Sequence, residues 1–433
     1  MPRSVSETPS EIPSDTRVPS RPRRIRRAIV AVALIAVVVA EIAAAVALLP
    51  FAVPVGLAYL NLFPSSGGAP APIQSADRSG SGPGTLVSAT TMPGVTRRIE
   101  ARGLRAARVL YRSTNGDTGE QTVVSGSVFV PTGTPPPGGW RVVAVGHGTL
   151  GIDGPCAPSL SDNMMGLLPF VTAFTGRGFA VAVADYEGLG TKGNHPYLDA
   201  RTAGLNIIDS VRALRHTFGD VSSVWMAFGH SQGGAATWAA DEQAGRYAAD
   251  LTLMGAVAAA PAADVSGFVD KALAHTLTPD QLLAMPVIVE SLARRHPDLN
   301  RDDYRSGAAT KYWQVLTACQ APEIYQRGDA GAQLRPEFVA PRDAAAADRL
   351  RRLLRDWALP QRPLSAPLSV WYGGADTLVD SAWTAAAIAK ACAMGGTVTV
   401  QFEPGKGHGD VDLASQLDWM AKRFADQPVP DDC

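Results

Sequence analysis

The chain has few cysteines and almost no net charge. Its 433 residues contain only four cysteines, and its formal net charge at pH 7 is -1. Clusters of Lys and Arg are scarce after Arg27, so the sequence offers no basic surface for the phosphate backbone that dominates nucleic-acid binding. We therefore expect no nucleic-acid partner.

The cysteines also lack the short paired spacings of a zinc or redox site. They are Cys156, Cys319, Cys392 and Cys433. No cluster with metal-ligand spacing and no Walker-type phosphate loop is evident in the sequence, so we expect neither a metal nor an organic cofactor. Four cysteines allow three disulfide pairings, and spacing cannot choose among them.

Two glycine-rich stretches spell the dinucleotide-binding pattern G-x-G-x-x-G, namely Gly146 to Gly151 and Gly188 to Gly193. That pattern holds a pyrophosphate only where a helix begins directly after it. Gly154-Pro155 and His195-Pro196 block such a helix. We interpret both stretches as loops shaped for close backbone approach or tight turning.

The N-terminus differs in composition from the rest of the chain. Residues 1–27 combine Ser, Pro and acidic residues with a group of arginines, which predicts a disordered tail with a basic flank. From Ala28 to Phe63 the only charged residue is Glu41, and a bilayer span needs about 20 residues. The run predicts either a membrane anchor with the N-terminus inside or a cleaved signal peptide. Both alternatives place the folded domain outside the cytoplasm, where disulfides are permitted.

Residues 64–95 are mostly Gly, Ser, Pro and Ala and predict a flexible linker. A single catalytic domain is expected over residues 96–433. Two β-rich runs, Ala106 to Ser113 and Gln121 to Val130, flank the turn Asn115-Gly116-Asp117. They predict an antiparallel hairpin that forms one edge of a sheet.

Short apolar runs alternate with helical patterns through the rest of the domain. Runs buried on both faces are typical of a parallel sheet, and their alternation with helices predicts a doubly wound α/β domain. Between residues 263 and 360 the helical patterns continue without a convincing strand, which predicts a helical cap inserted over the sheet. The predicted strands are 142–145, 179–184, 224–228, 253–259, 368–372 and 398–402, and the predicted helices include 204–216, 232–247, 279–295, 343–357 and 412–424.

Gly229-His230-Ser231-Gln232-Gly233 matches G-x-S-x-G, the pattern of a nucleophilic serine on a strained strand-to-helix turn. The match alone is weak in a glycine-rich chain. Here a strand-like run, Val224 to Phe228, precedes it and a good helix former, Ala235 to Ala240, follows it. This context favours Ser231 as a catalytic nucleophile over an ordinary loop serine.

A serine hydroxyl needs a histidine base that is itself oriented by a carboxylate. In α/β-hydrolase folds, which carry the serine on such a turn, the three residues occur along the chain in the order Ser, acid, His. His408 follows the last predicted strand in a glycine-rich loop, whereas His275 and His296 lie in the predicted cap. This placement favours His408 as the base over a solvated loop histidine.

Asp376 is the first acidic residue after the predicted strand Leu368 to Tyr372, which favours it as the acid. Asp380 is its rival. Because Asp often caps helices, we expect Asp380 to cap the helix that begins near Ser381 instead.

Acyl transfer also needs N–H donors for the oxyanion. The first predicted donor is the backbone of Gln232, which follows the nucleophile. The second comes from the loop Gly146 to Gly151, with Gly148 or Thr149 as the candidate. A tight turn with His147 packed underneath is the alternative for this loop.

Several segments of the chain resemble those of the secretory lipase family, over roughly Gly84 to the C-terminus. They are His147-Gly148-Thr149, Cys156-Ala157-Pro158-Ser159, Asp185-Tyr186-Glu187-Gly188-Leu189-Gly190, His195-Pro196-Tyr197-Leu198 and Gly229-His230-Ser231-Gln232-Gly233. The resemblance implies a triacylglycerol lipase or carboxylesterase of the α/β-hydrolase fold, with a helical cap over its acyl site and a lipid ester as substrate. It also implies the disulfides Cys156–Cys319 and Cys392–Cys433.

Further points stay open at the level of the sequence. An acyltransferase or peptidase is an alternative, because fold and triad determine the acyl-enzyme but not the acceptor. A catalytically silent lipid-binding protein is another, although such a protein has no use for a complete triad. We interpret the loop Asp185 to Leu198 as structural support rather than catalytic, and the sequence predicts neither the oligomeric state nor the acyl-chain length.

Overall fold

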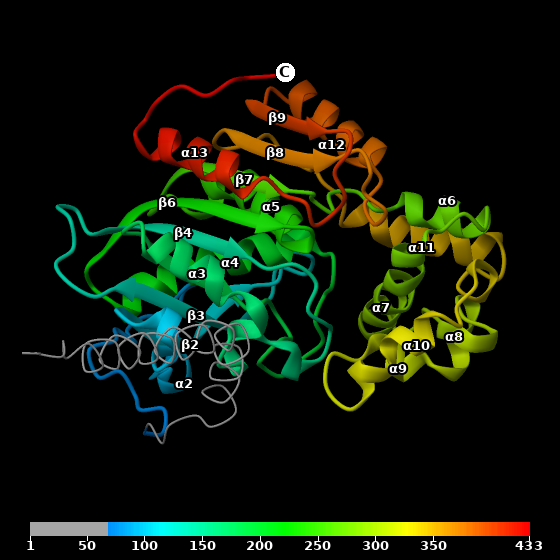
Figure 1. The fold of residues 1–433 in the computed structure, drawn as a ribbon, viewed down its shortest axis with the longest axis horizontal. Helices are drawn as coiled ribbons and strands as arrows, with labels where there is room; N and C mark the ends of the chain where they lie inside the picture. Colours follow the sequence, from blue (N-terminus) through cyan, green and yellow to red (C-terminus); the bar gives the residue numbers. More distant parts are fainter. Residues whose placement is uncertain (1–67) are drawn as a thin grey trace, which may run out of the picture. The chain divides into compact units, whose positions relative to one another are not determined.

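The structure is a computed structural model and describes residues 68–433. Within these residues nine strands form one sheet in the order β1-β2-β3-β5-β4-β6-β7-β8-β9 (Figure 1). The pairs β1–β2, β2–β3 and β3–β5 are antiparallel, and the remaining pairs are parallel. The predicted mostly parallel sheet is confirmed. Its parallel strands are β4 (Trp140–Gly146), β5 (Ala180–Ala184), β6 (Val221–His230), β7 (Thr252–Ala259), β8 (Leu368–Gly373) and β9 (Val398–Glu403).

The predicted hairpin is present as β2 (Leu104–Thr114) and β3 (Gln121–Pro131), but it is not the edge of the sheet. The strand β1 (Leu86–Thr91) pairs outside it, followed by the short helix α2 (Pro93–Thr96). The expectation of a flexible linker over residues 64–95 is therefore wrong from about residue 71 onward, because Ala71 and Ile73 hydrogen-bond to β1 and Ile73 and Ala76 pack on the core. The sequence of β1 mixes Ser and Thr with apolar residues, and its burial depends on packing against β2 rather than on a local pattern.

Helices cover the sheet on both faces. One face carries α4 (Ala200–Thr217), α5 (Gln232–Tyr247) and α12 (Ser381–Ala393), and the other carries α3 (Leu168–Thr175) and α13 (Leu413–Phe424). Because successive side chains of a strand point to opposite faces, Val142 and Ala144 of β4 join the first core while Val143 and Val145 join the second. Because both faces are buried, the sequences of these strands are continuous apolar runs.

Between β7 and β8 the chain forms a separate helical cap, as predicted. Residues 260–367 contain no strand, and their helices enclose a second apolar cluster, which also takes in Ile152 and Tyr197 from the loops after β4 and β5. Figure 1 shows these helices beside the sheet, at the right. The helices are α6 (Gly267–Leu273), α7 (Pro279–Arg295), α8 (Gly307–Lys311), α9 (Trp313–Thr317), α10 (Arg327–Gly331) and α11 (Ala344–Asp356).

The C-terminal residues 430–433 run alongside β9. The backbone N–H of Asp432 donates to the carbonyl of Val398 at 2.8 Å, and its carboxylate accepts from the N–H of Val400 at 2.7 Å. Cys433 is joined to Cys392 of α12 by a disulfide. The last strand of the sheet therefore has its free side covered by the tail, which satisfies backbone groups that pairing with β8 leaves unused.

The predicted N-terminal tail and the predicted membrane or signal segment, residues 1–27 and 28–63, lie outside the described residues. Both stay predictions, as does the start of the linker. Over residues 68–433, no helix has the length and apolar composition that crossing a bilayer requires.

Candidate active site

Ser231 lies on a sharp turn between β6 and α5, with φ 60° and ψ -121°. This is a backbone conformation that residues other than glycine rarely adopt. The turn also brings backbone segments close together, because a Cβ on Gly229 would overlap the carbonyl of Gly233, and a Cβ on Gly233 would overlap the carbonyl of Gly146. The glycines of the G-x-S-x-G motif are therefore required by sterics.

The structure brings Ser231, His408 and Asp376 together. His408 Nε2 lies 2.9 Å from Ser231 Oγ, and His408 Nδ1 lies 2.7 Å from Asp376 Oδ2. The Asp376 side chain is only 2% exposed, and its other oxygen accepts the N–H groups of Leu378 and Val379 at 2.8 and 2.9 Å. With Nδ1 donating to the carboxylate, Nε2 is free to accept the serine proton, which is the arrangement that nucleophilic catalysis requires.

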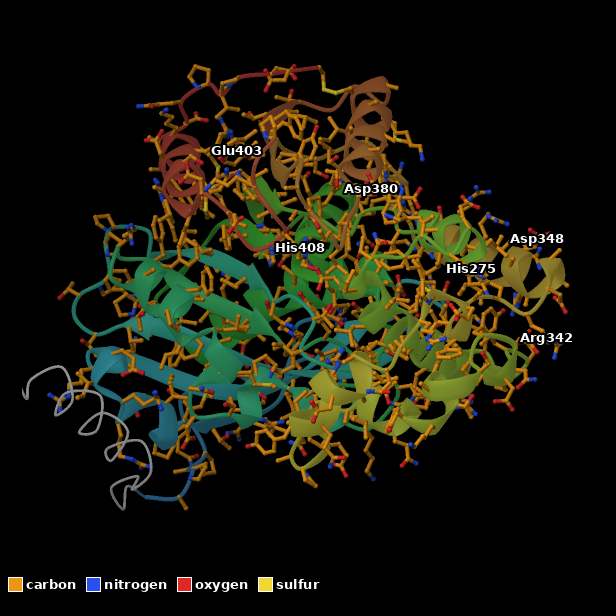
Figure 2. The ribbon with its side chains drawn as sticks, turned by 45° about the vertical axis from the view of Figure 1, so that its right-hand side comes forward. His275, Arg342, Asp348, Asp380, Glu403 and His408 are labelled. Carbon is orange, nitrogen blue, oxygen red and sulfur yellow. A yellow bond between two sulfur atoms is a disulfide. The ribbon has the colours of Figure 1, made fainter. Side chains whose placement is uncertain are left out.

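The rival acid has a different position. Asp380 caps α12, with its carboxylate accepting the N–H of Ala382 at 3.1 Å, as the sequence predicts. It also lies 3.7 Å from Lys271 of the cap. Figure 2 shows His275 on the cap, well away from His408, so it has no place in this cluster.

His230, which sequence reasoning treated only as a spacer in the motif, contacts the base. Its Nε2 lies 2.7 Å from the carbonyl oxygen of His408, and the two rings are 4.8 Å apart. Burial lowers the pKa of His230, so the neutral ring donates through Nε2 to that carbonyl. The residue before the nucleophile therefore holds the backbone of the base. The only sequence signal was its place between Gly229 and Ser231.

The loops after β8 and β9, which carry Asp376 and His408, are joined to each other. The N–H of Ala375 donates to the carbonyl of Lys406 at 2.9 Å, and the N–H of Gly374 donates to Glu403 at 2.9 Å. A Cβ on Gly373 would overlap the carbonyl of Lys406. The loops that carry Asp376 and His408 are therefore held together as one hydrogen-bonded unit.

The predicted oxyanion loop passes beside the nucleophile. A Cβ on Gly148 would lie 3.8 Å from Cβ of Ser231. Within the described part of the chain, the backbone N–H groups of Gln232, Gly148 and Thr149 have no acceptor. His147 is buried beneath the loop against Tyr186, with ring centroids 4.3 Å apart. His147 is thus packed underneath the loop, as the tight-turn alternative expects. The N–H groups of Gly148 and Thr149 nevertheless remain available to a ligand.

The loop Asp185 to Leu198 contacts the residue that follows the nucleophile. His195 Nδ1 lies 2.9 Å from the carbonyl of Glu187, and its Nε2 lies 2.9 Å from Nε2 of Gln232. Burial lowers the pKa of His195 to about 3. The neutral ring therefore donates to Glu187 and accepts from Gln232, the residue that follows the nucleophile. The contact spans 37 residues of sequence, so no local pattern indicates it.

Two disulfides are present, Cys156–Cys319 and Cys392–Cys433, the pairings that the family resemblance implies. The first links the segment after the oxyanion loop to the cap. Gly151 packs directly on this bridge, since a Cβ there would overlap Cys156 Sγ and Cys319 Cβ. The disulfide therefore supports the oxyanion loop as well as the cap.

The cap meets the loops of the site through polar contacts. Thr278 Oγ1 donates to the carbonyl of Thr377 at 2.5 Å, next to Asp376. Ser291 Oγ donates to the carbonyl of His195 at 2.7 Å. Arg294 pairs with Asp153 near the oxyanion loop at 2.7 Å. Over residues 68–433, no three or more His, Cys, Asp or Glu side chains are grouped to hold a metal ion.

A family model described as secretory lipase matches residues 165–432. The chain belongs to the secretory lipase family. Among curated proteins it is similar to a probable inactive lipase of Mycobacterium tuberculosis (strain CDC 1551 / Oshkosh), with 25% identity over 371 residues that cover 81% of this chain and 80% of that protein.

Solved structures of lipases and esterases share the fold. Candida antarctica lipase A in its closed state has a TM-score of 0.65 and 17% identity, and the match covers 83% of this chain and 85% of that one. The rice cell wall degrading esterase LipA from Xanthomonas oryzae has a TM-score of 0.60 and 19% identity, and covers 80% and 97%. The chain has an α/β-hydrolase-like fold, and family and fold together support an ester hydrolase.

Proposed function

We propose that this secretory lipase is an active serine hydrolase of lipid esters that works through an acyl-enzyme on Ser231. The observation that carries the proposal is the pair of hydrogen bonds from Ser231 Oγ to His408 Nε2 and from His408 Nδ1 to Asp376 Oδ2. A serine hydroxyl is a poor nucleophile unless a base takes its proton, and this arrangement provides the base and its orienting carboxylate.

In the first half-reaction, Ser231 Oγ attacks the ester carbonyl while its proton passes to His408 Nε2. Asp376 stabilises the imidazolium that forms, through Nδ1–H. His408 then returns the proton to the alcohol oxygen as the ester C–O bond breaks. Water attacks the acyl-enzyme by the same steps and releases the carboxylic acid.

The negative charge on the tetrahedral oxygen needs donors that are already in place. We assign this role to the backbone N–H of Gln232 together with that of Gly148 or Thr149. Each well-placed donor contributes on the order of 100-fold to 1000-fold in rate. The availability of these N–H groups and the approach of Gly148 to Ser231 support the assignment.

The mycobacterial relative is named as inactive, and that name concerns the relative. In this chain the three triad side chains are all present and in contact, which supports catalysis over silent lipid binding. An extracytoplasmic location is also part of the proposal. It is supported by the secretory family and by two disulfides, which persist in oxidising compartments. Attachment to a membrane through residues 28–63 stays a separate prediction.

Hydrolysis of p-nitrophenyl esters from acetate to palmitate tests the proposal. We expect Ser231→Ala to lower kcat by about 10,000-fold or more, with an unchanged melting temperature. Ser222→Ala, near the other end of β6, is the matched control and should keep wild-type activity. A p-nitrophenyl phosphonate should label Ser231, as seen by peptide mass spectrometry. If the wild type releases product from no ester, the hydrolase proposal fails and lipid binding becomes the leading function.

A further inference from the structure

Beside the candidate triad lies an apolar cavity of about 290 Å³. Its walls come from the oxyanion loop at Gly146 to Gly148, from His230, and from the start of α3 at Leu167 and Phe170. The remaining wall is the chain that follows His408, including Val411. No cap residue lines this cavity, so it is separate from the acyl site that the family resemblance places under the cap.

The cavity begins next to the reacting groups. Gly148 in its wall faces Ser231, because a Cβ built on Gly148 would lie 3.8 Å from the serine Cβ. Gly409, also in the wall, directly follows His408. His230 separates the cavity from the His408 backbone to which it is hydrogen-bonded. The cavity is therefore bounded by the immediate chain neighbours of Ser231 and His408, although these two residues do not line it themselves.

The side on which the cavity lies indicates which half of the ester it receives. The alcohol oxygen must be within reach of His408 Nε2 to take its proton, so the alcohol leaves on the side of the base. Gly409, Val411 and Leu413, which continue the chain from the base, form the wall on that side. The acyl half, held by its carbonyl between Gln232 and the oxyanion loop, is left to extend toward the cap.

Size and charge restrict what the cavity accepts. An apolar cavity of about 150 Å³ holds a benzene molecule, so one of about 290 Å³ has room for an aryl or short alkyl group. No Asp, Glu, Lys or Arg lines the cavity. Burial lowers the pKa of His147 and of His230, so both rings are neutral and offer no charge to an ionic headgroup.

We propose that this cavity binds the alcohol half of the substrate, and that the alcohol is a small uncharged apolar one, aryl or short alkyl. The proposal rests on the proposed function, since it names the substrate class of the same site. It makes esters of such alcohols, rather than phospholipids with an ionic headgroup, the preferred substrates.

Two ester series measured with the full chain test the assignment. One keeps the acyl group as butyrate and varies the alcohol from methyl to butyl, cyclohexyl and benzyl. The other keeps the methyl alcohol and varies the acyl group from acetate to decanoate. Leu167→Trp and Val411→Trp each fill the cavity from a different wall, so one remains informative if the other fails to fold. Leu160→Trp, at a position 55% exposed and outside the cavity, is the matched control.

We expect each filling variant to lower kcat/KM for benzyl butyrate by at least about tenfold, a typical effect of a blocked apolar pocket. The value for methyl butyrate should change by less than about twofold. The control should match the wild type in both series. If the filling variants change the acyl series instead, or change neither series, the assignment is overturned.

A binding measurement separates failure of the cavity assignment from failure of the proposed function. Benzyl alcohol binding to the Ser231→Ala protein, followed by ligand-observed NMR, requires no turnover. Binding that is lost when Leu167→Trp or Val411→Trp is added supports the cavity, even if no ester is hydrolysed. Absence of binding, or binding that both variants leave unchanged, overturns it whatever the activity.

Discussion

The end of the sheet and the cap contribute to the candidate site through different kinds of contact. On the sheet side, steric close approach and backbone hydrogen bonds hold the triad loops, as at Gly233 and between Ala375 and Lys406. On the cap side, a few polar side chains, one disulfide and the packing of Ile152 and Tyr197 into the cap cluster hold the loops. We infer that the sheet provides the chemistry, and that the cap adjusts the loops around it.

The most demanding test of this division is a change to the acid on the sheet side. Asp376→Asn should lower kcat by about 10,000-fold, because an amide no longer holds the imidazole in its active tautomer. The amide oxygen still accepts the N–H groups of Leu378 and Val379, so the loop should keep its shape. Steady-state kinetics with p-nitrophenyl butyrate measures the loss.

Asp380→Asn is the matched control for that variant. It caps α12 and contacts Lys271 of the cap, so kcat should stay within about twofold and stability should fall by at most about 1 kcal/mol. A large loss of kcat in Asp380→Asn with activity retained in Asp376→Asn would reverse the assignment of the acid.

The disulfides test the link between the two regions. In the chain-entropy relation, removing Cys156–Cys319, which closes 163 residues, costs about 5 kcal/mol, and removing Cys392–Cys433, which closes 41, costs about 4 kcal/mol. Only the first supports the oxyanion loop at Gly151. Replacing both Cys156 and Cys319 by Ser should also lower kcat by about tenfold. This is smaller than the loss expected when an oxyanion donor is removed altogether.

The double variant at Cys392 and Cys433 is the control and should keep its kcat. Both proteins are compared at a temperature where circular dichroism shows each to be folded. Equal kcat values in the two variants would mean that the cap bridge does not position the oxyanion loop.

A smaller effect is expected at a polar contact of the cap. Thr278 both caps α7 and donates to Thr377 beside the acid. Thr278→Val should lower the free energy of unfolding by about 1 to 2 kcal/mol and change kcat by less than about threefold. Thr276→Val, outside the helix, is the control for both measurements. A loss of kcat near that of Asp376→Asn would make the cap part of the catalytic machinery.

A further effect, on pH-dependent stability rather than on kcat, concerns the segment that returns from the cap to β8. Asp241 of α5 is fully buried and accepts the N–H groups of Ser365 and Ala366. Burial raises its pKa to about 7. A carboxyl whose pKa is raised on folding stabilises the protein fully below its unfolded pKa, near 4, and this contribution is lost as pH rises through about 7.

Asp241→Asn keeps an oxygen that accepts both N–H groups and removes the titration. Its melting temperature should therefore fall less between pH 5 and pH 8 than that of the wild type. Some pH dependence should remain, because burial also raises the pKa of Glu242, to about 8. An exposed change, Asp418→Asn, should keep the wild-type slope. If Asp241→Asn has that slope as well, its carboxyl is not the group that titrates.

Local signals explain which parts of the molecule were predictable. The glycines beside Ser231 encode the steric needs of a turn, and the order of Ser231, Asp376 and His408 follows from strands that are recognisable as apolar runs. The contact of His230 with His408 joins positions 178 residues apart, so it depends on how β6 and the loop after β9 meet. The cavity behind Gly148 and the strand β1 likewise depend on packing between distant segments.

The tail at residues 430–433 has a consequence for how copies of the molecule behave toward one another. An unprotected final strand offers a template on which another chain can add by strand pairing. Here Asp432 and its neighbours already bond to Val398 and Val400, and the bridge from Cys433 to Cys392 keeps them there. Reduction of that bridge leaves only hydrogen bonds to hold the tail, so we expect a reducing environment to promote self-association through β9.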